Sequence, residues 1–485
     1  MTGVRGGVIA AGRRGPGIAA RPAAASRPVA ILLGSELLAS VLGFGVMVHL
    51  ARRLGPSGFA DFEYASAVAA WWLVVVRGGF DAIAYREAAR RPGLVGPLTD
   101  QLLGLRLASA AVGLAAVAGL ACAAGLARAP VVAVAGLVLV PSAFAADVGP
   151  RASGRFGGLG LAQAARAVGL LIAAGWLVAG PGDATLAAGC VVGAEVVSTL
   201  VLLGFHAVEH GLPRPRFRRR AWAALARRGA IAGATRFGRV SLYAADVLAL
   251  GAVAGSALGP YAAARRLAFA LLALGLVVPT AVAPRVARAW AAGAGEARSV
   301  IGRTFAGLAS AGLPATVGLM ATADRWMPRL FGEGFREGAP WLALIAARLP
   351  FVLASNVQQA ALIACRREGA ALRLIGGMSA LGLATIPAMG WRYGPWGVAL
   401  SALGVEVAGA VGGWIALRGI GLAPDWHHSA GPAAAGCVAL AMACRAGRDW
   451  PLGPVVFAGA LVYGLVWRAA TEVGRRASFS GGPAR

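Results

Sequence analysis

The chain has 485 residues, of which 58% are hydrophobic and only 14% are charged, and its formal net charge at pH 7 is +26. A soluble protein carries nearer a quarter of charged residues, so this composition excludes an ordinary soluble globular protein. All 46 basic residues are Arg, which excludes both an ATPase site built on the Lys of a phosphate-binding loop and Schiff-base catalysis through Lys.

Apolar runs long enough to cross a bilayer as helices recur along the chain. They predict an all-α integral membrane protein with about fourteen transmembrane helices, and its 71 glycines suit close helix packing. Residues 1–28 and 471–485 are expected to be tails, the first of them disordered. The predicted spans are 29–50, 62–80, 101–125, 130–148, 157–180, 184–206, 230–252, 261–283, 301–323, 339–362, 371–390, 395–417, 431–446 and 452–470.

The distribution of Arg between the spans predicts the orientation. Segments on the side of the N-terminus carry about three times as many Arg as segments on the opposite side, and cytoplasmic loops are the ones enriched in Arg. Both termini are therefore expected in the cytoplasm. The densest block runs from His210 to Arg228. Nucleic-acid binding is one interpretation of such a block, but a solvated loop beside anionic lipid is favoured, and no nucleic-acid partner is expected.

Short matches relate the two sides of this basic block. Leu54-Gly55-Pro56 corresponds to Leu258-Gly259-Pro260, and Gly193–Val196 (GAEV) corresponds to Gly404–Val407 (GVEV). An even number of spans per copy gives both copies the same orientation, so the pattern predicts two parallel six-helix repeats around a central cavity. The predicted six-helix bundles are 29–209 and 230–418, joined by a basic linker at 210–229 and followed by two additional helices within 419–470.

Charged residues inside the predicted spans are the candidate functional residues, because an ionised group at the bilayer centre costs about 2.5–3.5 kcal/mol on insertion scales. In span 230–252, four polar residues follow a helical spacing that places them on one stripe about 80° wide. These four are Arg236, Arg239, Tyr243 and Asp246. Other substrate-binding candidates are Arg77, Arg106, Arg166 and Arg348, and candidates for ion coupling are Asp246, Glu36, Glu195 and Glu406.

This excess of Arg predicts a cationic cavity for an anionic headgroup, because Arg stays charged and binds phosphate oxygens bidentately. Structural roles remain open for several candidates. Arg77, Arg106 and Arg265 are also consistent with snorkelling to the membrane surface. Asp246 is also consistent with an Arg ion pair, and Glu195 and Glu406 with bonds across helices. No metal site, catalytic residue or cofactor is expected.

Several segments in the same order resemble a known family, the Wzx-type polysaccharide-biosynthesis flippases of the multidrug/oligosaccharidyl-lipid/polysaccharide exporter superfamily. The segments are Ala51–Phe59 (ARRLGPSGF), Gly79–Glu87 (GFDAIAYRE), Asp246–Gly251 (DVLALG), Leu258–Tyr261 (LGPY), Leu330–Phe335 (LFGEGF) and Tyr393–Ala399 (YGPWGVA). The resemblance covers roughly residues 30–420. One departure is the absence of Lys, which members of the family use in their cavities alongside Arg.

The resemblance implies two six-helix bundles with two extra helices, no covalent chemistry, and transport of undecaprenyl-pyrophosphate-linked sugar units by alternating access. It places the protein in a bacterial inner membrane, with a polysaccharide polymerase and a chain-length regulator as expected partners. Two alternatives remain. One is an ion-coupled multidrug exporter of the same superfamily, which the intramembrane Arg oppose. The other is a polyprenyl-dependent glycosyltransferase, for which Asp61 and Glu63 would be a metal-binding acid pair.

Overall fold

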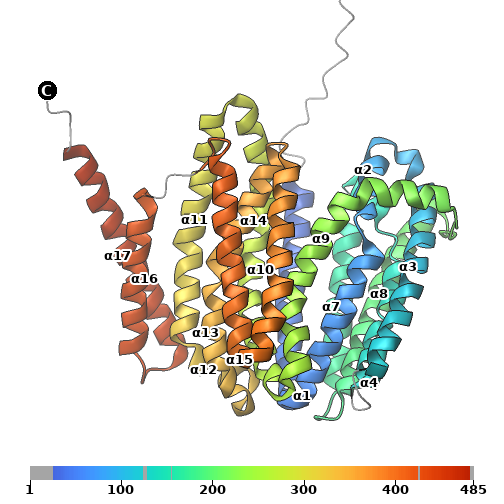
Figure 1. Ribbon diagram of the computed structural model, residues 1–485, viewed down its shortest axis with the longest axis horizontal. Coiled ribbons are helices and arrows are strands. Elements are labelled where there is room, and N and C mark those ends of the chain that lie inside the picture. Colours follow the sequence, from blue (N-terminus) through green and yellow to red (C-terminus); the bar gives the residue numbers. More distant parts are fainter. Residues whose placement is uncertain (1–25, 124–127, 155, 424–426, 481–485) are drawn as a thin grey trace, which may run out of the picture.

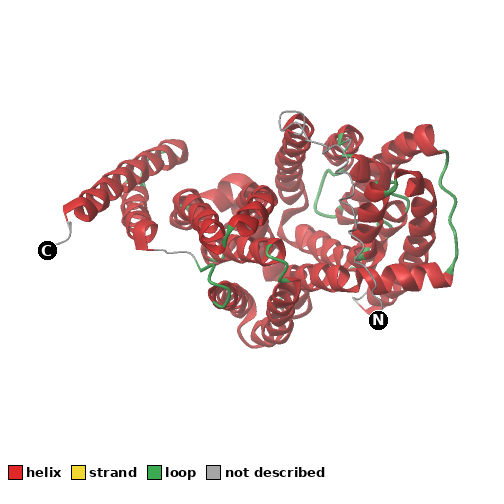
Figure 2. Cartoon of the chain, turned by 90° about the horizontal axis from the view of Figure 1, so that it is seen from above, coloured by secondary structure: helices red, strands yellow, loops and turns green. Residues whose placement is uncertain are grey.

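The structure, a computed structural model, describes residues 26–123, 128–154, 156–423 and 427–480, with the side chains at 26–33, 35–37, 273–281, 427–431 and 473–480 left out. Within these ranges the chain forms helices and loops and no strand, as Figure 2 shows. Eight of the described helices are long and apolar enough to cross a membrane, and two shorter apolar helices accompany them. The prediction of an all-α membrane protein is confirmed.

Two of the long helices are hairpins that each contain two predicted spans. The helix α1 (Ser26–Arg77) reverses at Gly55 (φ 66°), and α15 (Glu368–Arg418) reverses at Gly394 (φ 57°). A positive φ is a conformation that glycine adopts without a steric penalty, and a proline follows each of these glycines. The two arms of α15 are joined by a hydrogen bond of 2.7 Å between the hydroxyl groups of Ser401 and Thr385.

The first bundle packs around the two arms of α1. Pro141 and the glycines of this region interrupt its fourth predicted span, which becomes the short helices α4 and α5. The other elements of the first bundle are α2 (Phe80–Arg90), η1 (Pro92–Leu94), α3 (Val95–Ala123), α4 (Ala129–Gly136), α5 (Leu139–Ala143), α6 (Val148–Ser153), α7 (Gly157–Leu177) and α8 (Ala184–His210).

The second bundle packs α9 against α15 and α10 against α14. Its elements before α15 are α9 (Arg219–Val253), α10 (Gly255–Ala292), α11 (Ala294–Ala321), α12 (Ala323–Phe331), η2 (Glu333–Gly338), α13 (Ala339–Ala347) and α14 (Leu349–Ala364). Because Ala and Arg favour helix, α9 begins within the segment predicted as a linker. The helices α16 (His427–Ala446) and α17 (Leu452–Ser480) pack on each other and on α11, at the edge of the molecule in Figure 1.

We call the end of the molecule that carries Gly55 and Gly394 the hairpin end, which is the lower end in Figure 1, and the opposite end, where Gly211–Arg218 joins α8 to α9, the basic end. The helix α1 begins and α17 ends at the basic end. The bundles meet where α1 packs against α9 and α10 and where α2 packs against α9. Apolar side chains of both bundles form one buried cluster there.

Polar contacts also join the two bundles toward the hairpin end. Arg266 of α10 forms an ion pair of 2.8 Å with Glu63 of α1. Arg128 pairs with Asp61 at 2.7 Å and also donates a hydrogen bond of 2.7 Å to the carbonyl of Gly251 in α9. Because the Arg266–Glu63 ion pair and the Arg128–Gly251 hydrogen bond each join the first bundle to the second, they close the hairpin end in this conformation.

A close backbone approach between the bundles generates a prediction about Gly259. A methyl group at Gly259 of α10 would collide with the backbone of Pro56, whereas a methyl group at Gly307 of α11 has no neighbour within 4 Å. Ala is favoured over Gly in a helix by about 1 kcal/mol. We therefore expect Gly307→Ala to raise the thermal midpoint of the purified protein and Gly259→Ala to lower it, because overpacking costs about 1–3 kcal/mol. Equal effects of the two substitutions would contradict this helix contact.

Candidate functional site

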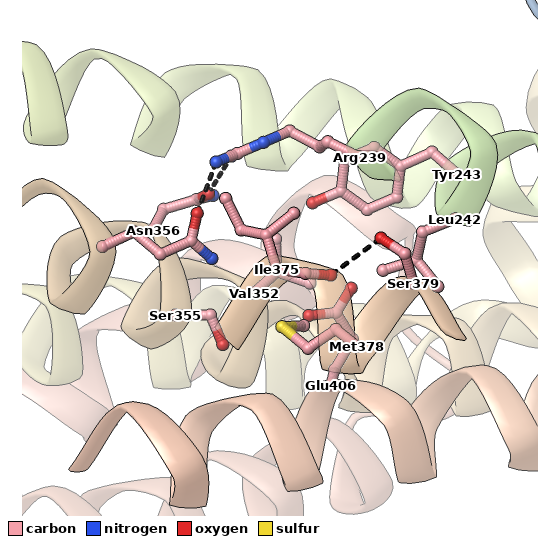
Figure 3. A pocket seen from close by; sticks show the side chains of 11 residues that line it. Arg239, Leu242, Tyr243, Val352, Ser355, Asn356, Ile375, Met378, Ser379 and Glu406 are labelled. Atoms are coloured by element: carbon pink, nitrogen blue, oxygen red, sulfur yellow. Dashed lines mark hydrogen bonds between the residues drawn. The ribbon is translucent and has the colours of Figure 1, made fainter. Parts of the chain in front are cut away.

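A polar pocket lies inside the second bundle, between α9, α14 and the two arms of α15. Its cavity has a volume of about 20 Å³, which is room for about one water molecule. Its polar lining consists of Arg239, Tyr243, Ser355, Asn356, Gln359, Ser379 and Glu406. In Figure 3, Arg239 and Tyr243 extend from α9 on one side, and Glu406 lies on the opposite side. The pocket thus brings a cation, an anion and neutral hydrogen-bonding groups together within an apolar bundle.

Arg239 is held by neutral amides. Its guanidinium donates hydrogen bonds of 2.5 Å to Asn356 Oδ1 and to Gln359 Oε1, both on α14. Neither acceptor carries a charge, and no carboxylate lies within ion-pair distance of Arg239 among the described residues. The amides orient the guanidinium without forming an ion pair with it, and the carboxylate of Glu406 lines the same pocket on the opposite side, beyond ion-pair distance from Arg239.

Arg348 is held differently, at the break between α13 and α14. Its side chain is 2% exposed and lies 3.6 Å from Asp246 and 3.6 Å from Glu406. Asp246 also lies 3.5 Å from Arg265. The two buried carboxylates and the two guanidinium groups therefore balance each other's charge in a network next to the pocket. Glu406 belongs to this network and also lines the pocket.

Several buried polar atoms around the pocket have no hydrogen-bond partner among the described residues. They are Nε and Nη1 of Arg348, Oε1 of Glu406, Nδ2 of Asn356 and Oγ of Ser355. Buried polar groups are normally paired with protein or water, and the ion-pair distances of Arg348 are longer than those of a charge-assisted hydrogen bond. The site consequently has unused capacity to bind a small polar species, such as water or an ion.

Arg77 and Arg106 lie in the first bundle, away from this pocket. Arg106 is 2% exposed and pairs with Asp81 at 2.8 Å and with Asp147 at 3.2 Å. Arg77 pairs with the same Asp147 at 2.9 Å. This charge network holds α1, α2 and α3 together with the segment between α5 and α6.

The remaining candidates are more exposed. Arg236 is exposed on α9, without an ion pair among the described residues. Arg166 of α7 has a side chain that is 48% exposed and lies 3.8 Å from Glu195 of α8. Glu195 also accepts a hydrogen bond of 3.3 Å from Ser142. Glu36 belongs to α1, but its side chain lies outside the described part of the structure.

The stripe of four residues predicted on α9 divides between three environments. Arg239 and Tyr243 line the pocket, Asp246 is buried in the network with Arg348, and Arg236 is exposed. The α9 helix also contacts the first bundle near this stripe, because Trp71 of α1 stacks on Phe237 and donates a hydrogen bond of 2.6 Å to Ser241. The pocket is therefore separated from the bundle interface by α9 alone.

Sequence reasoning missed the neutral part of the site. Asn356 and Gln359 lie with Ser355 and Gln358 in a helix that is otherwise apolar, and this cluster of neutral polar residues was the available signal. It also missed Asp81 and Asp147 as buried partners of Arg106, because both lie at the ends of predicted spans rather than inside them.

Comparison with known proteins supports the fold. No family model and no curated protein matches the sequence. Among solved structures, the chain is similar to the lipid II flippase MurJ in an inward closed conformation, with 12% identity, 93% of this chain and 100% of that chain covered, and a TM-score of 0.72. It is also similar to an inward-facing multidrug resistance transporter of the MATE family, with 12% identity, coverage of 81% and 98%, and a TM-score of 0.62.

A third similar structure is the MATE multidrug transporter DinF-BH in complex with R6G, with 14% identity, coverage of 82% and 96%, and a TM-score of 0.57. Identities this low demonstrate the fold alone. The chain shares its fold with this flippase and these two transporters, and the segment with this fold spans nearly the full length of each of the three structures.

The contrast between Arg106 and Arg166 gives a stability prediction. Arg106→Gln leaves two buried carboxylates short of their partner, so we expect a loss of about 3–5 kcal/mol in the free energy of unfolding. Arg166→Gln removes a long, exposed ion pair, so we expect a loss of less than about 1 kcal/mol. Thermal unfolding of the two purified variants measures the difference. A larger effect at Arg166 would show that Arg106 is not a structural cation.

Proposed function

We propose that this protein is a flippase that carries a lipid-linked sugar with a phosphate or pyrophosphate group across a bacterial inner membrane. The observation that carries the proposal is the placement of Arg239, which neutral amides orient in a pocket one helix away from the bundle interface and which has no direct ion pair among the described residues. A guanidinium that is held in place without a direct carboxylate partner is suited to phosphate oxygens. The fold shared with transporters supports the same class of function.

The substrate contacts that we propose are Arg239, Arg236 and Tyr243 on α9, with Arg166 on the first bundle. The exposed Arg236 and Arg166 would meet the anionic headgroup as it enters, and Arg239 would bind it more deeply. The lipid tail would stay in the bilayer while the sugar crosses between the bundles, which would have to separate because their apolar side chains form one buried cluster in this conformation. Arg348, Arg77 and Arg106, which are paired with carboxylates, would maintain the structure of the bundles.

Alternating access follows from the contacts that close the hairpin end. If the basic end faces the cytoplasm, the ion pair of Arg266 with Glu63 and the bond from Arg128 to Gly251 would hold the outer side closed. Entry from the inner side would require the contacts of α2 with α9, which exist in this conformation, to open. Release to the outer leaflet would require the contacts at the hairpin end to break while α2 remains packed on α9. A polysaccharide polymerase and a chain-length regulator would act on the released unit.

Two other functions are less well supported. A cation exporter needs acidic groups free to bind a cation, but Asp246 and Glu406 lie beside Arg348, and Arg239 adds a positive charge to the pocket. A glycosyltransferase would need Asp61 and Glu63 to bind a metal, yet Asp61 pairs with Arg128 and Glu63 pairs with Arg266. We therefore propose no enzymatic activity.

Transport in proteoliposomes tests the function. Wild-type protein should translocate a prenyl-pyrophosphate-linked sugar, and the double variant Arg236→Glu, Arg239→Glu should not, because both charges that meet the phosphate are reversed. Arg227→Glu with Arg228→Glu is the matched control, since it reverses two exposed charges nearer the start of the same helix. Transport of a cationic dye by wild-type protein, without transport of the lipid-linked sugar, would establish the exporter instead.

Coupling to an ion gradient is proposed at the Asp246–Arg348–Glu406 network. Each elementary charge moved across 100 mV is worth about 2.3 kcal/mol, and Oε1 of Glu406 has no hydrogen-bond partner among the described residues. We expect Glu406→Gln to abolish the dependence of transport on a sodium or proton gradient while substrate binding persists. Glu195→Gln, which alters a partly exposed carboxylate of the first bundle, should leave that dependence intact. If Glu195→Gln abolishes the dependence on the ion gradient and Glu406→Gln does not, the coupling residue is Glu195 and this proposal is wrong.

A further inference from the structure

A second pocket lies at the basic end, beyond the part of α14 that lines the pocket of Arg239. It has a volume of about 480 Å³ and lies between the end of α14, the start of α15 and the end of α15. Its rim is formed by Arg366, Arg367 and Arg373, and its floor is aliphatic, with Leu362, Ile415 and Ile420. Nothing in the proposed transport cycle uses this pocket.

The three guanidinium groups of the rim have no carboxylate partner among the described residues. The nearest acidic residue in sequence, Glu368, is exposed, does not line the pocket and forms no ion pair in the described structure. Arg106 and Arg348, by contrast, each pair with two carboxylates. Three like charges around one hollow repel each other, and an anion bound between them relieves that repulsion.

The backbone at the rim is unusual as well. Arg366 has a φ of 58° and is the one residue other than glycine with a positive φ in the described part of the chain. Its N–H donates to the carbonyl of Ile363 at 3.0 Å, and the N–H of Arg367 donates to that of Leu362 at 2.8 Å. This is the helix-ending arrangement in which glycine is favoured at the position of Arg366. Strained backbone conformations cluster at functional sites, so the charged and strained Arg366 supports a binding role for this pocket.

We propose that this pocket binds the phosphate group of an anionic phospholipid. Arg binds phosphate through paired hydrogen bonds, and the aliphatic floor suits the glycerol and the first methylenes of an acyl chain, which a free phosphate lacks. Ile415 is exposed on the side of the bundle, where lipid would surround a membrane protein. The pocket is independent of Arg239 and Glu406, so the inference does not rest on the proposed transport function.

Native mass spectrometry of the full-length protein in detergent provides the test. The probes are dioleoylphosphatidylglycerol, dioleoylphosphatidylcholine and inorganic pyrophosphate. Wild-type protein should bind phosphatidylglycerol in preference to phosphatidylcholine. Each Arg near an anionic lipid is worth about fivefold in affinity, so the triple variant Arg366→Gly, Arg367→Gln, Arg373→Gln should bind phosphatidylglycerol about a hundredfold more weakly. Arg303→Gln, which removes an exposed charge from α11 at the same end, is the matched control.

The single variant Arg366→Gly distinguishes an effect on phospholipid binding from an effect on protein stability. Glycine relieves the positive φ, so the thermal midpoint should stay the same or rise while the affinity for phosphatidylglycerol falls about fivefold. If pyrophosphate binds to the wild type and not to the triple variant, the pocket is a phosphate-binding site whose ligand is a soluble phosphate compound rather than a phospholipid. If the triple variant retains the affinity of the wild type for phosphatidylglycerol, or if the wild type binds none of the anionic probes, the proposal is overturned.

Discussion

The stability of the helical bundles depends on which hydrogen-bond acceptors the arginine side chains inside them find. A guanidinium removed from water loses a large hydration energy and needs several acceptors to recover it. Arg106 and Arg348 obtain them from carboxylates, which neutralise the charge. Arg239 obtains them from the amides of Asn356 and Gln359, which leave the charge in place. The choice of acceptor therefore decides whether a buried Arg stabilises a bundle or is available to bind an anion.

Arginines paired with carboxylates and the arginine bound by amides lie at different positions along the helices. Carboxylate pairs tie helices together near the ends of the spans, as in the network of Arg106, Asp81 and Asp147, and close the hairpin end through Glu63 and Arg266. Between these fixed points, α9 lies at the junction of the two bundles and carries Arg236 on its exposed surface and Arg239 toward the pocket. A single helix thus links the bundle interface to the polar interior of the second bundle.

The sequence was sufficient to predict an all-α membrane protein, because the length and hydropathy of an apolar run are local properties. The structure adds that the chain reverses at Gly55, which Pro56 follows. The sequence was insufficient to separate Arg106 from Arg239, because their difference depends on partners distant in the chain: Asp147 is 41 residues from Arg106, and Asn356 is 117 residues from Arg239. Helical periodicity also grouped Arg236 with Asp246, although packing against neighbouring helices separates their environments.

The chain uses no lysine at all, and this has a consequence for its titration behaviour. A lysine in an apolar site can release its proton and become neutral, whereas arginine does not deprotonate in proteins. An anion site built from arginine therefore cannot release its anion by losing its own charge. Departure of the anion from such a site must come from a change in geometry or from a competing negative group.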